Sequence, residues 1–272
     1  VNFKNFEILN IDLLNKKEVK TFIADIRPSI VFNLTGPSSV YESLKNSKIE
    51  EEIRVIFDNL TSSLIEDGNF CKFFQASSSE MYGLNNKEVV YSENSSFIPN
   101  SPYANAKLLN HNKVKELTEN FDWKIYSGIL FNHESEFRDS DYLIMKIIKG
   151  AIEIKNRKKN YLHLGSLELK RDWSYAEEIV HGILEMTLHG KSFDYVLGSG
   201  KATSIKEIVN IVFNYFDLDY QEFIRIDKNI LRENDPKTII ADPSKIKNDL
   251  GWSTKKDIEE FLHIIIKNYT NY

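Results

Sequence analysis

A tyrosine and a lysine four residues apart, Tyr103 and Lys107, have the types and the spacing of a catalytic pair. Ser101 and Pro102 precede them and mark the start of a helix, so both side chains lie on one helical face. A lysine ammonium beside a phenol favours the phenolate and lowers its pKa from about 10. A phenolate can take the proton of a hydroxyl while a hydride leaves the same carbon. The pair therefore predicts a redox reaction on an alcohol.

A serine-rich segment lies ahead of this helix, where residues 76–83 read ASSSEMYG after a predicted buried strand. A serine there can hydrogen-bond a substrate hydroxyl and the phenolate, and the carboxylate of Glu80 at the same strand end can act as a base or an acid. The alternative interpretation is a polar turn with a helix cap. We take one of these serines and Glu80, together with Tyr103 and Lys107, as the candidate catalytic residues.

The elements that must position these residues alternate along the chain. Apolar segments of strand length are expected at 6–11, 29–34, 70–76 and 123–130. Helices with periodic apolar positions are expected at 15–26, 49–66 and 103–120, the first with Asp12 as a candidate cap. The alternation predicts a parallel sheet covered by helices on both faces, with ligands at the carboxyl ends of its strands.

Beyond about residue 135 the pattern changes to helices interrupted by short strands. The helices are expected at 141–155, 174–189, 204–216 and 256–270, and the strands near 161–164, 193–197 and 223–227. This mixed part predicts a smaller domain, although residues 173–196 are expected to rejoin the first sheet.

The composition is that of an ordinary globular protein, with 272 residues of which 42% are hydrophobic. A net charge of −5 argues against a protein that coats nucleic acid. The single cysteine, Cys71, excludes an internal disulfide and a multi-cysteine metal site, and its apolar neighbours predict a buried thiol. We expect no membrane segment and a cytoplasmic location, because neither a long apolar stretch nor an N-terminal signal region occurs.

The order of the motifs resembles the extended short-chain dehydrogenase/reductase family. Within that family the chain is similar to the GDP-mannose 4,6-dehydratases, because residues 128–135 read GILFNHES and residues 170–173 read KRDW. The C-terminal pattern of that group is matched by Arg232, Asp235, Asp242, Lys245, Leu250, Gly251 and Trp252.

The resemblance implies dehydration of a GDP-sugar with NADP as cofactor. Tyr103 would deprotonate the C4 hydroxyl as hydride passes to NADP, with Ser78 where the family has threonine. Glu80 would remove the C5 hydrogen while the C6 hydroxyl departs as water, and hydride would return to C6. Epimerases usually lack this carboxylate, but sugar-nucleotide decarboxylases keep it. Another epimerase, decarboxylase or reductase reaction, or a non-catalytic sugar-nucleotide-binding homologue, therefore stays open.

The resemblance also implies binding residues, and a forked cationic donor suits a diphosphate. For the substrate these are Ser79, Asn132, Lys146, Arg171, Arg232 and Asp235. For NADP, with NAD as an alternative, they are Asp12, Leu13, Leu34, Thr35, Tyr103, Lys107 and His133. Three simpler interpretations stay open: a surface ion pair for Arg171 with Asp172, a solvated helix face for Lys146, and a structural hydrogen bond for His133. A metal-binding role for His133 is disfavoured, because no second histidine occurs at a spacing from it that is typical of metal ligands.

The fold that the resemblance implies is a Rossmann-like doubly wound parallel sheet with a smaller mixed α/β substrate domain. Residues 1–132 and about 173–200 would bind NADP, and about 133–172 and 201–272 would bind the nucleotide sugar. The family's glycine-rich loop after its first strand does not occur among the 272 residues. We therefore expect the sequence to be part of a longer protein, and, as in the family, a homodimer or homotetramer.

Overall fold

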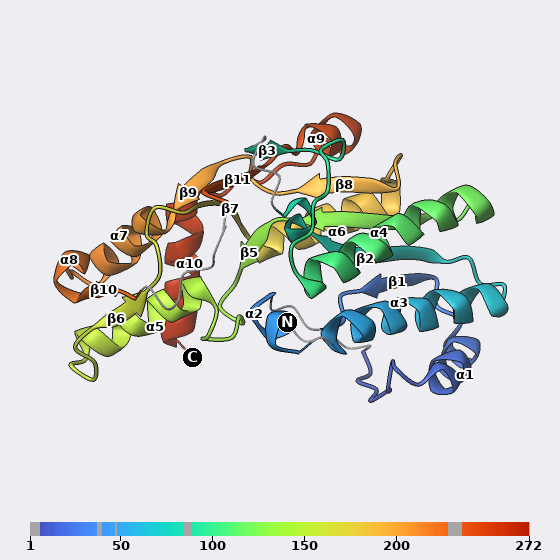
Figure 1. Cartoon of the computed structure of the whole chain (residues 1–272), viewed down its shortest axis with the longest axis horizontal. Helices are drawn as coiled ribbons and strands as arrows, with labels where there is room; N and C mark the ends of the chain where they lie inside the picture. The colour runs from blue at the N-terminus through green and yellow to red at the C-terminus, as the bar shows by residue number, and fades with distance from the viewer. Residues whose placement is uncertain (1–5, 37–39, 47, 84–88, 228–235, 272) are drawn as a thin grey trace.

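The computed structural model in Figure 1 describes residues 6–36, 40–46, 48–83, 89–227 and 236–271. It is an α/β protein with two groups of elements. One group surrounds a four-stranded parallel sheet. The other holds the remaining strands, and its helices α5, α7, α8 and α10 lie at the opposite end of the molecule (Figure 1). No helix in these described ranges is both long and apolar enough to cross a membrane.

The first sheet has the strand order β1-β2-β4-β8, and each neighbouring pair is parallel. Its strands are β1 (Ile30–Asn33), β2 (Lys72–Ser78), β4 (Ile125–Leu130) and β8 (Asp194–Leu197). The helices that connect them include α2 (Val40–Lys45), α3 (Lys48–Glu66), α4 (Pro102–Phe121) and α6 (Ala176–His189). Parallel neighbours joined by helical crossovers make this a Rossmann-like sheet, as predicted.

Phe73 and Phe74 show how helices cover both faces of this sheet, because consecutive strand residues point in opposite directions. The ring of Phe73 packs in a cluster with residues of α3, α4 and α1 (Lys16–Ile26). The ring of Phe74 packs with residues of α6 and α9 (Ser244–Leu250). Both rings are fully buried. The alternation of apolar strands and amphipathic helices therefore yields the predicted doubly covered sheet.

The predicted strand at residues 6–11 is wrong, because this segment has no strand conformation. Its apolar side chains are largely in solvent: Phe6 is 66% exposed and Ile8 is 86% exposed. A short apolar segment becomes a strand only where a neighbouring strand pairs with it. The helix that follows does form, but Asn15 caps it by accepting a hydrogen bond from the backbone N–H of Glu18 at 3.3 Å. Asp12 instead accepts from Leu14.

The second group contains a sheet of order β3-β11-β7-β5, with β9 antiparallel to β7, and a parallel pair of β6 and β10. Its strands are β3 (Val90–Tyr91), β5 (Asn132–Glu134), β6 (Leu162–Leu164), β7 (Lys170–Tyr175), β9 (Ala202–Ser204), β10 (Ile224–Ile226) and β11 (Thr238–Ala241). Its helices are α5 (Leu143–Lys155), α7 (Ile205–Tyr215), α8 (Tyr220–Phe223) and α10 (Ile258–Asn271). These helices share one apolar core. The borders proposed between a cofactor domain and a substrate domain stay a prediction, since β7 lies in the second sheet and β8 in the first.

Candidate functional site

The carboxyl end of β2 carries the serine-rich segment, which turns at once into the short helix η1 (Ser79–Tyr82). The hydroxyl of Ser78 caps this turn by accepting a hydrogen bond from the backbone N–H of Glu80 at 3.2 Å. Gly83 ends the turn with a φ of 53°, and a Cβ there would lie 1.8 Å from the carbonyl oxygen of Ile98. Only glycine fits this position. The cap and the glycine together fix the turn that carries Glu80.

Helix α4 presents the predicted tyrosine and lysine to this turn. The Ser101 hydroxyl caps the helix by accepting from the backbone N–H of Ala104 at 3.1 Å, and Pro102 occupies the first turn. Tyr103 and Lys107 are both buried, at 8% and 5% exposure.

The four candidate catalytic side chains come together where α4 meets β2. Tyr103 is hydrogen-bonded to Ser78, and the Glu80 charge acts on the same phenol. The Lys107 ammonium donates a hydrogen bond to the carbonyl oxygen of Ala76 at 2.9 Å and lies 5.6 Å from the centre of the Tyr103 ring. Their catalytic roles stay predictions.

The pKa values of the pair differ from the expectation. Burial raises the pKa of Tyr103 to about 12, against the lowering effects of the Ser78 hydrogen bond and the Arg138 charge. Burial lowers the pKa of Lys107 to about 8. The expected lowering of the tyrosine pKa is therefore wrong for this arrangement, because desolvation of both groups outweighs their nearby charges.

The segment after β4 carries further polar side chains, in the strand β5 and in the turn that follows it. Asn132 is half-buried there. His133 donates from Nδ1 to the carbonyl oxygen of Phe131 at 2.8 Å, and burial lowers the pKa of His133. The structural hydrogen bond considered for His133 is thus confirmed. Glu134 is 4% exposed, and burial raises the pKa of this carboxyl to about 7.

Arg138 is a site residue that the sequence analysis missed. Its Cζ lies 3.6 Å from the centre of the Tyr142 ring, and its Nε lies 3.9 Å from Oε2 of Glu134. The charge of the same guanidinium partly opposes the rise that burial causes in the pKa of Tyr103, and it adds to the lowering that burial causes in the pKa of His133. The available signal was its spacing of four residues from Glu134, which pairs an acid with a base across one turn.

The predicted substrate residues are only partly placed. Arg171 donates from Nη1 to the carbonyl oxygens of Lys170 and Pro236, both at 2.8 Å. A surface ion pair of Arg171 with Asp172 is wrong, because Asp172 is fully buried and accepts from backbone N–H groups. Lys146 is half-buried on α5. Ser79 is buried in η1. Arg232 and Asp235 lie outside the described residues.

The predicted cofactor residues Leu34 and Thr35 follow β1 directly, at the same sheet edge as Ser78. Leu34 is 60% exposed, and the Thr35 hydroxyl donates to Oδ1 of Asn33 at 2.5 Å. Asn33 donates to the Gln75 side chain at 2.7 Å, and Gln75 donates to the same Ala76 carbonyl that binds Lys107. A chain of polar side chains therefore joins this strand end to Lys107. Asp12 and Leu13 lie further out, exposed and half-buried respectively.

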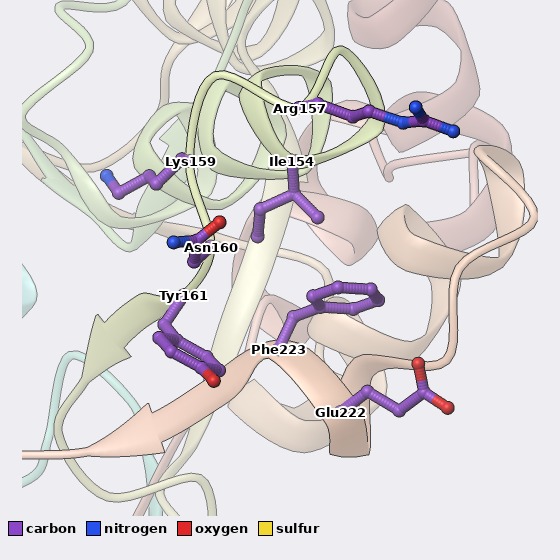
Figure 2. Close-up of a pocket in the computed structure, with 7 residues that line it drawn as sticks. All are labelled: Ile154, Arg157, Lys159, Asn160, Tyr161, Glu222 and Phe223. Atoms are coloured by element: carbon purple, nitrogen blue, oxygen red, sulfur yellow. The ribbon is translucent and has the colours of Figure 1, made fainter.

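A hollow of about 470 Å³ lies away from these residues, where the C-terminal end of α5 meets β6 and α8. It is lined by Ile154, Arg157, Lys159, Asn160, Tyr161, Glu222 and Phe223. Figure 2 shows Ile154 and Phe223 pointing toward one another, while the charged ends of Arg157, Lys159 and Glu222 point outward. None of the catalytic candidates contributes to it. Within the described ranges, no three His, Cys, Asp or Glu side chains gather in a way that could hold a metal ion.

Residues 1–265 match the protein family described as GDP-mannose 4,6 dehydratase. The chain is 29% identical over 260 residues to GDP-mannose 4,6 dehydratase 1 of Arabidopsis thaliana, covering 94% of this chain and 72% of the relative. It is 27% identical over 284 residues to GDP-mannose 4,6-dehydratase of Sinorhizobium fredii, covering 96% and 80%.

Solved structures share the fold at lower sequence identity. The protein RMD from Pseudomonas aeruginosa, complexed with NADPH, is 19% identical with a TM-score of 0.88, covering 97% of this chain and 88% of that one. The dTDP-glucose 4,6-dehydratase from Bacillus anthracis, in complex with NAD, is 17% identical with a TM-score of 0.86, covering 99% and 81%.

Proposed function

This chain belongs to the GDP-mannose 4,6-dehydratase family, and from that premise we propose that it dehydrates GDP-mannose or a closely related GDP-sugar to the 4-keto-6-deoxy product with NADP. The family makes it an enzyme of the extended short-chain dehydrogenase/reductase type. The observation that carries the proposal is the position of the Glu80 carboxylate, in the turn directly after β2, where its charge acts on the buried Tyr103 phenol. A carboxylate beside the tyrosine provides the base that dehydration needs in addition to alcohol oxidation.

The donor set at the sheet edge supports a nicotinamide cofactor. An exposed apolar side chain (Leu34), a hydroxyl (Thr35) and the phenol–amine pair of α4 suit an aromatic ring attached to a ribose. Leu34, Thr35, Tyr103, Lys107 and His133 would hold this half of NADP, with Asp12 and Leu13 further out. When bound, NADP supplies a hydride acceptor and a positively charged ring; NAD is the alternative.

Tyr103 would take the proton of the sugar C4 hydroxyl during oxidation of that carbon. Ser78 would hold the same hydroxyl, since its side chain is already hydrogen-bonded to the phenol. Lys107 would keep a positive charge behind the phenol and so favour the phenolate. The hydrogen bond to Ala76 fixes the ammonium in that position.

Glu80 would perform the elimination. The C4 ketone acidifies the C5 hydrogen, and the carboxylate accepts that proton as the C5–C6 double bond forms. The C6–O bond breaks, and the protonated carboxyl gives the proton to the departing hydroxyl, which leaves as water. The neighbouring residue, Ser79, has no acidic group. This is consistent with the single carboxyl of Glu80 both accepting the C5 proton and protonating the departing C6 hydroxyl.

The nucleotide diphosphate would be held by cationic and amide groups, with Arg171 as the described guanidinium. Its Nη1 is anchored on two backbone carbonyls. A guanidinium fixed in this way suits a phosphate oxygen. Asn132, Lys146 and the pair Arg232 and Asp235 are the further proposed contacts.

Incubation of the purified protein with GDP-mannose and NADP tests the proposal. The expected product has lost one water and carries a C4 ketone, both visible by mass spectrometry and NMR. UDP-glucose and dTDP-glucose serve as matched control substrates. A change of configuration at C4 without loss of water points instead to an epimerase. Binding of GDP-mannose without any turnover favours a non-catalytic sugar-nucleotide-binding protein.

A further inference from the structure

A third side chain, His111, continues the catalytic face of helix α4. Tyr103, Lys107 and His111 follow one another at intervals of four residues, so they lie along one face of the helix. The first is hydrogen-bonded to Ser78 in β2, and the second to the carbonyl of Ala76 in β2. The third, which is 4% exposed, lies against β4.

His111 is hydrogen-bonded to the strands beneath the helix. Its Nδ1 lies 2.8 Å from the Ser127 hydroxyl oxygen in β4. That hydroxyl lies 2.7 Å from the hydroxyl of Ser77 in β2. Both serine side chains are buried. Ser77 stands between Ala76 and Ser78, the two residues that contact Lys107 and Tyr103. The imidazole therefore connects α4 to the same stretch of β2 that holds the catalytic pair.

The ring of His111 is fixed from its other sides as well. Its Nε2 lies 3.9 Å from Oδ2 of Asp194, whose other oxygen accepts from Lys245 at 2.6 Å. The rings of Phe97 and Phe193 lie 5.2 Å and 5.6 Å from the imidazole centre. Lys245 balances the Asp194 charge, so the aspartate does not need a protonated histidine as its partner.

We propose that His111 is a positioning residue for the catalytic pair, because its hydrogen bond to Ser127 fixes where α4 stands along β2 and thereby where Tyr103 and Lys107 meet Ser78 and Ala76. This inference rests on the proposed function for its catalytic consequence. A helix rises about 1.5 Å per residue, and hydrogen bonds tolerate only a few tenths of an ångström. Without the His111 contact, α4 can slide by an amount that misplaces the phenol.

The test compares His111→Leu, which removes the ring nitrogens, with His111→Asn, whose amide occupies the place of Nδ1. The first readout needs no substrate: the pKa of Lys107, followed by NMR of isotope-labelled lysine. In His111→Leu this pKa should rise from about 8 by about one unit, because a displaced α4 admits water to the amine. His111→Asn should restore it.

The second readout is turnover of GDP-mannose. His111→Leu should lower kcat roughly tenfold with KM little changed, and His111→Asn should recover most of the loss. Ser127→Ala removes the partner and should act in the same direction as His111→Leu. If His111→Leu does not fold, Ser127→Ala decides in its place.

Thr187→Val is the matched control for a purely structural loss. Its buried hydroxyl donates to the Ile183 carbonyl at 2.6 Å within α6. This variant should lower the melting temperature without moving the Lys107 pKa. The proposal is overturned if His111→Leu, or Ser127→Ala in its place, loses stability while the Lys107 pKa and kcat stay at the wild-type values. A wild-type protein without turnover counts against the proposed function alone, because the lysine titration is independent of it.

Discussion

Tyr103 and Lys107 are held in a site where desolvation works against both of their charges. The pKa of the phenol is raised to about 12, and the pKa of the amine is lowered to about 8. The phenol is therefore neutral at physiological pH in this arrangement, and the amine is still mostly protonated. The oxidised cofactor would bring a positively charged ring beside the phenol, and this charge would favour the phenolate. Removal of the proton from Tyr103 would therefore depend on the presence of the oxidised cofactor.

The titration of Lys107 predicts an alkaline limit of activity. As pH rises through about 8 the ammonium loses its proton, and the charge that favours the phenolate disappears. Turnover of GDP-mannose should therefore fall above pH 8. Lys107→Arg keeps a charge at all relevant pH values, so its kcat profile should lack this limb even if its maximum is lower. A limb near pH 8 that persists in the arginine variant would contradict the assignment.

Glu80→Gln separates elimination from oxidation. The amide cannot accept the C5 proton, so formation of the dehydrated sugar should fall by at least about 100-fold. Oxidation at C4 depends on Tyr103 and should continue, so reduced cofactor should accumulate and be visible by absorbance. Exchange of the C5 hydrogen with deuterated water reports the same step directly. Undiminished dehydration or exchange in this variant would show that another group is the base.

At the scale of elements, Asp172 ties β7 to two neighbouring segments. Its carboxylate accepts from the backbone and hydroxyl of Ser199, both at 2.7 Å, and from the backbone N–H groups of Gly200 at 2.8 Å and Ala241 at 3.1 Å. The side chain is fully buried. One residue thus fixes the turn after β8 and the end of β11 against the strand that carries Arg171.

Removal of this carboxylate should cost stability rather than chemistry. Asp172→Ala leaves three backbone N–H groups, of which that of Ala241 is buried, without their acceptor, a loss of about 3 kcal/mol in the free energy of unfolding. Asp257→Ala is the matched control, because its exposed carboxylate accepts one backbone N–H, from Glu260, at 2.9 Å. That variant should lose only about 1 kcal/mol. Urea denaturation of both variants checks the difference, and equal losses would contradict the role given to Asp172.

The long elements could be predicted from the sequence, and so could the short strands β1, β6, β8 and β10, whereas β3, β9 and β11 could not. Helices such as α3, α4 and α10 carry periodic apolar positions over several turns, and β2 and β4 carry continuous apolar runs. Strands β3, β9 and β11 have two to four residues, too few for any periodicity, and they form because a partner strand lies beside them. The same tertiary dependence explains why residues 6–11 form no strand.

The residues of the candidate site likewise fall into those that the sequence indicates and those that it does not. Tyr103, Lys107, Ser78 and Glu80 follow from local spacing and from a recognisable motif order. Arg138 and His111 act on or through partners that are distant in sequence, Tyr103 and Ser127, so their spacing of four residues from Glu134 and Lys107 does not by itself indicate a role in the site. The direction of the pKa shift of Tyr103 also could not be predicted from the sequence, because it depends on how deeply the phenol is buried.

At the scale of the whole molecule, a chain of polar side chains connects the helices on the two faces of the first sheet. It runs from His111 in α4 through Asp194 in β8 to Lys245 in α9, which covers the opposite face. Buried charges in such a chain stay stable only while each keeps its partner. Protonation of the one neutral member, His111, would place an additional positive charge near Lys245. The stability of the whole fold should therefore respond to pH through this histidine.

The direction of that response follows from the lowered pKa of His111, about 4 in the folded chain against 6.5 as its ordinary value. Above pH 6.5 neither state binds the proton, and the contribution is fully present. As pH falls from 6.5 to 4 the unfolded chain takes up the proton and the folded chain does not, so about 3 kcal/mol of stability is lost. Glu134, whose pKa is raised to about 7, acts in the opposite direction over its own range.

The wild-type curve alone cannot isolate His111, but its difference from His111→Asn can, since Glu134 contributes equally to both. The asparagine variant should lose about 3 kcal/mol less than the wild type between pH 6.5 and 4, measured by urea unfolding at each pH. Parallel curves would mean that His111 is protonated in the folded chain. In that case Asp194 would be its charged partner, and the neutral hydrogen bond to Ser127 would not describe how α4 is held.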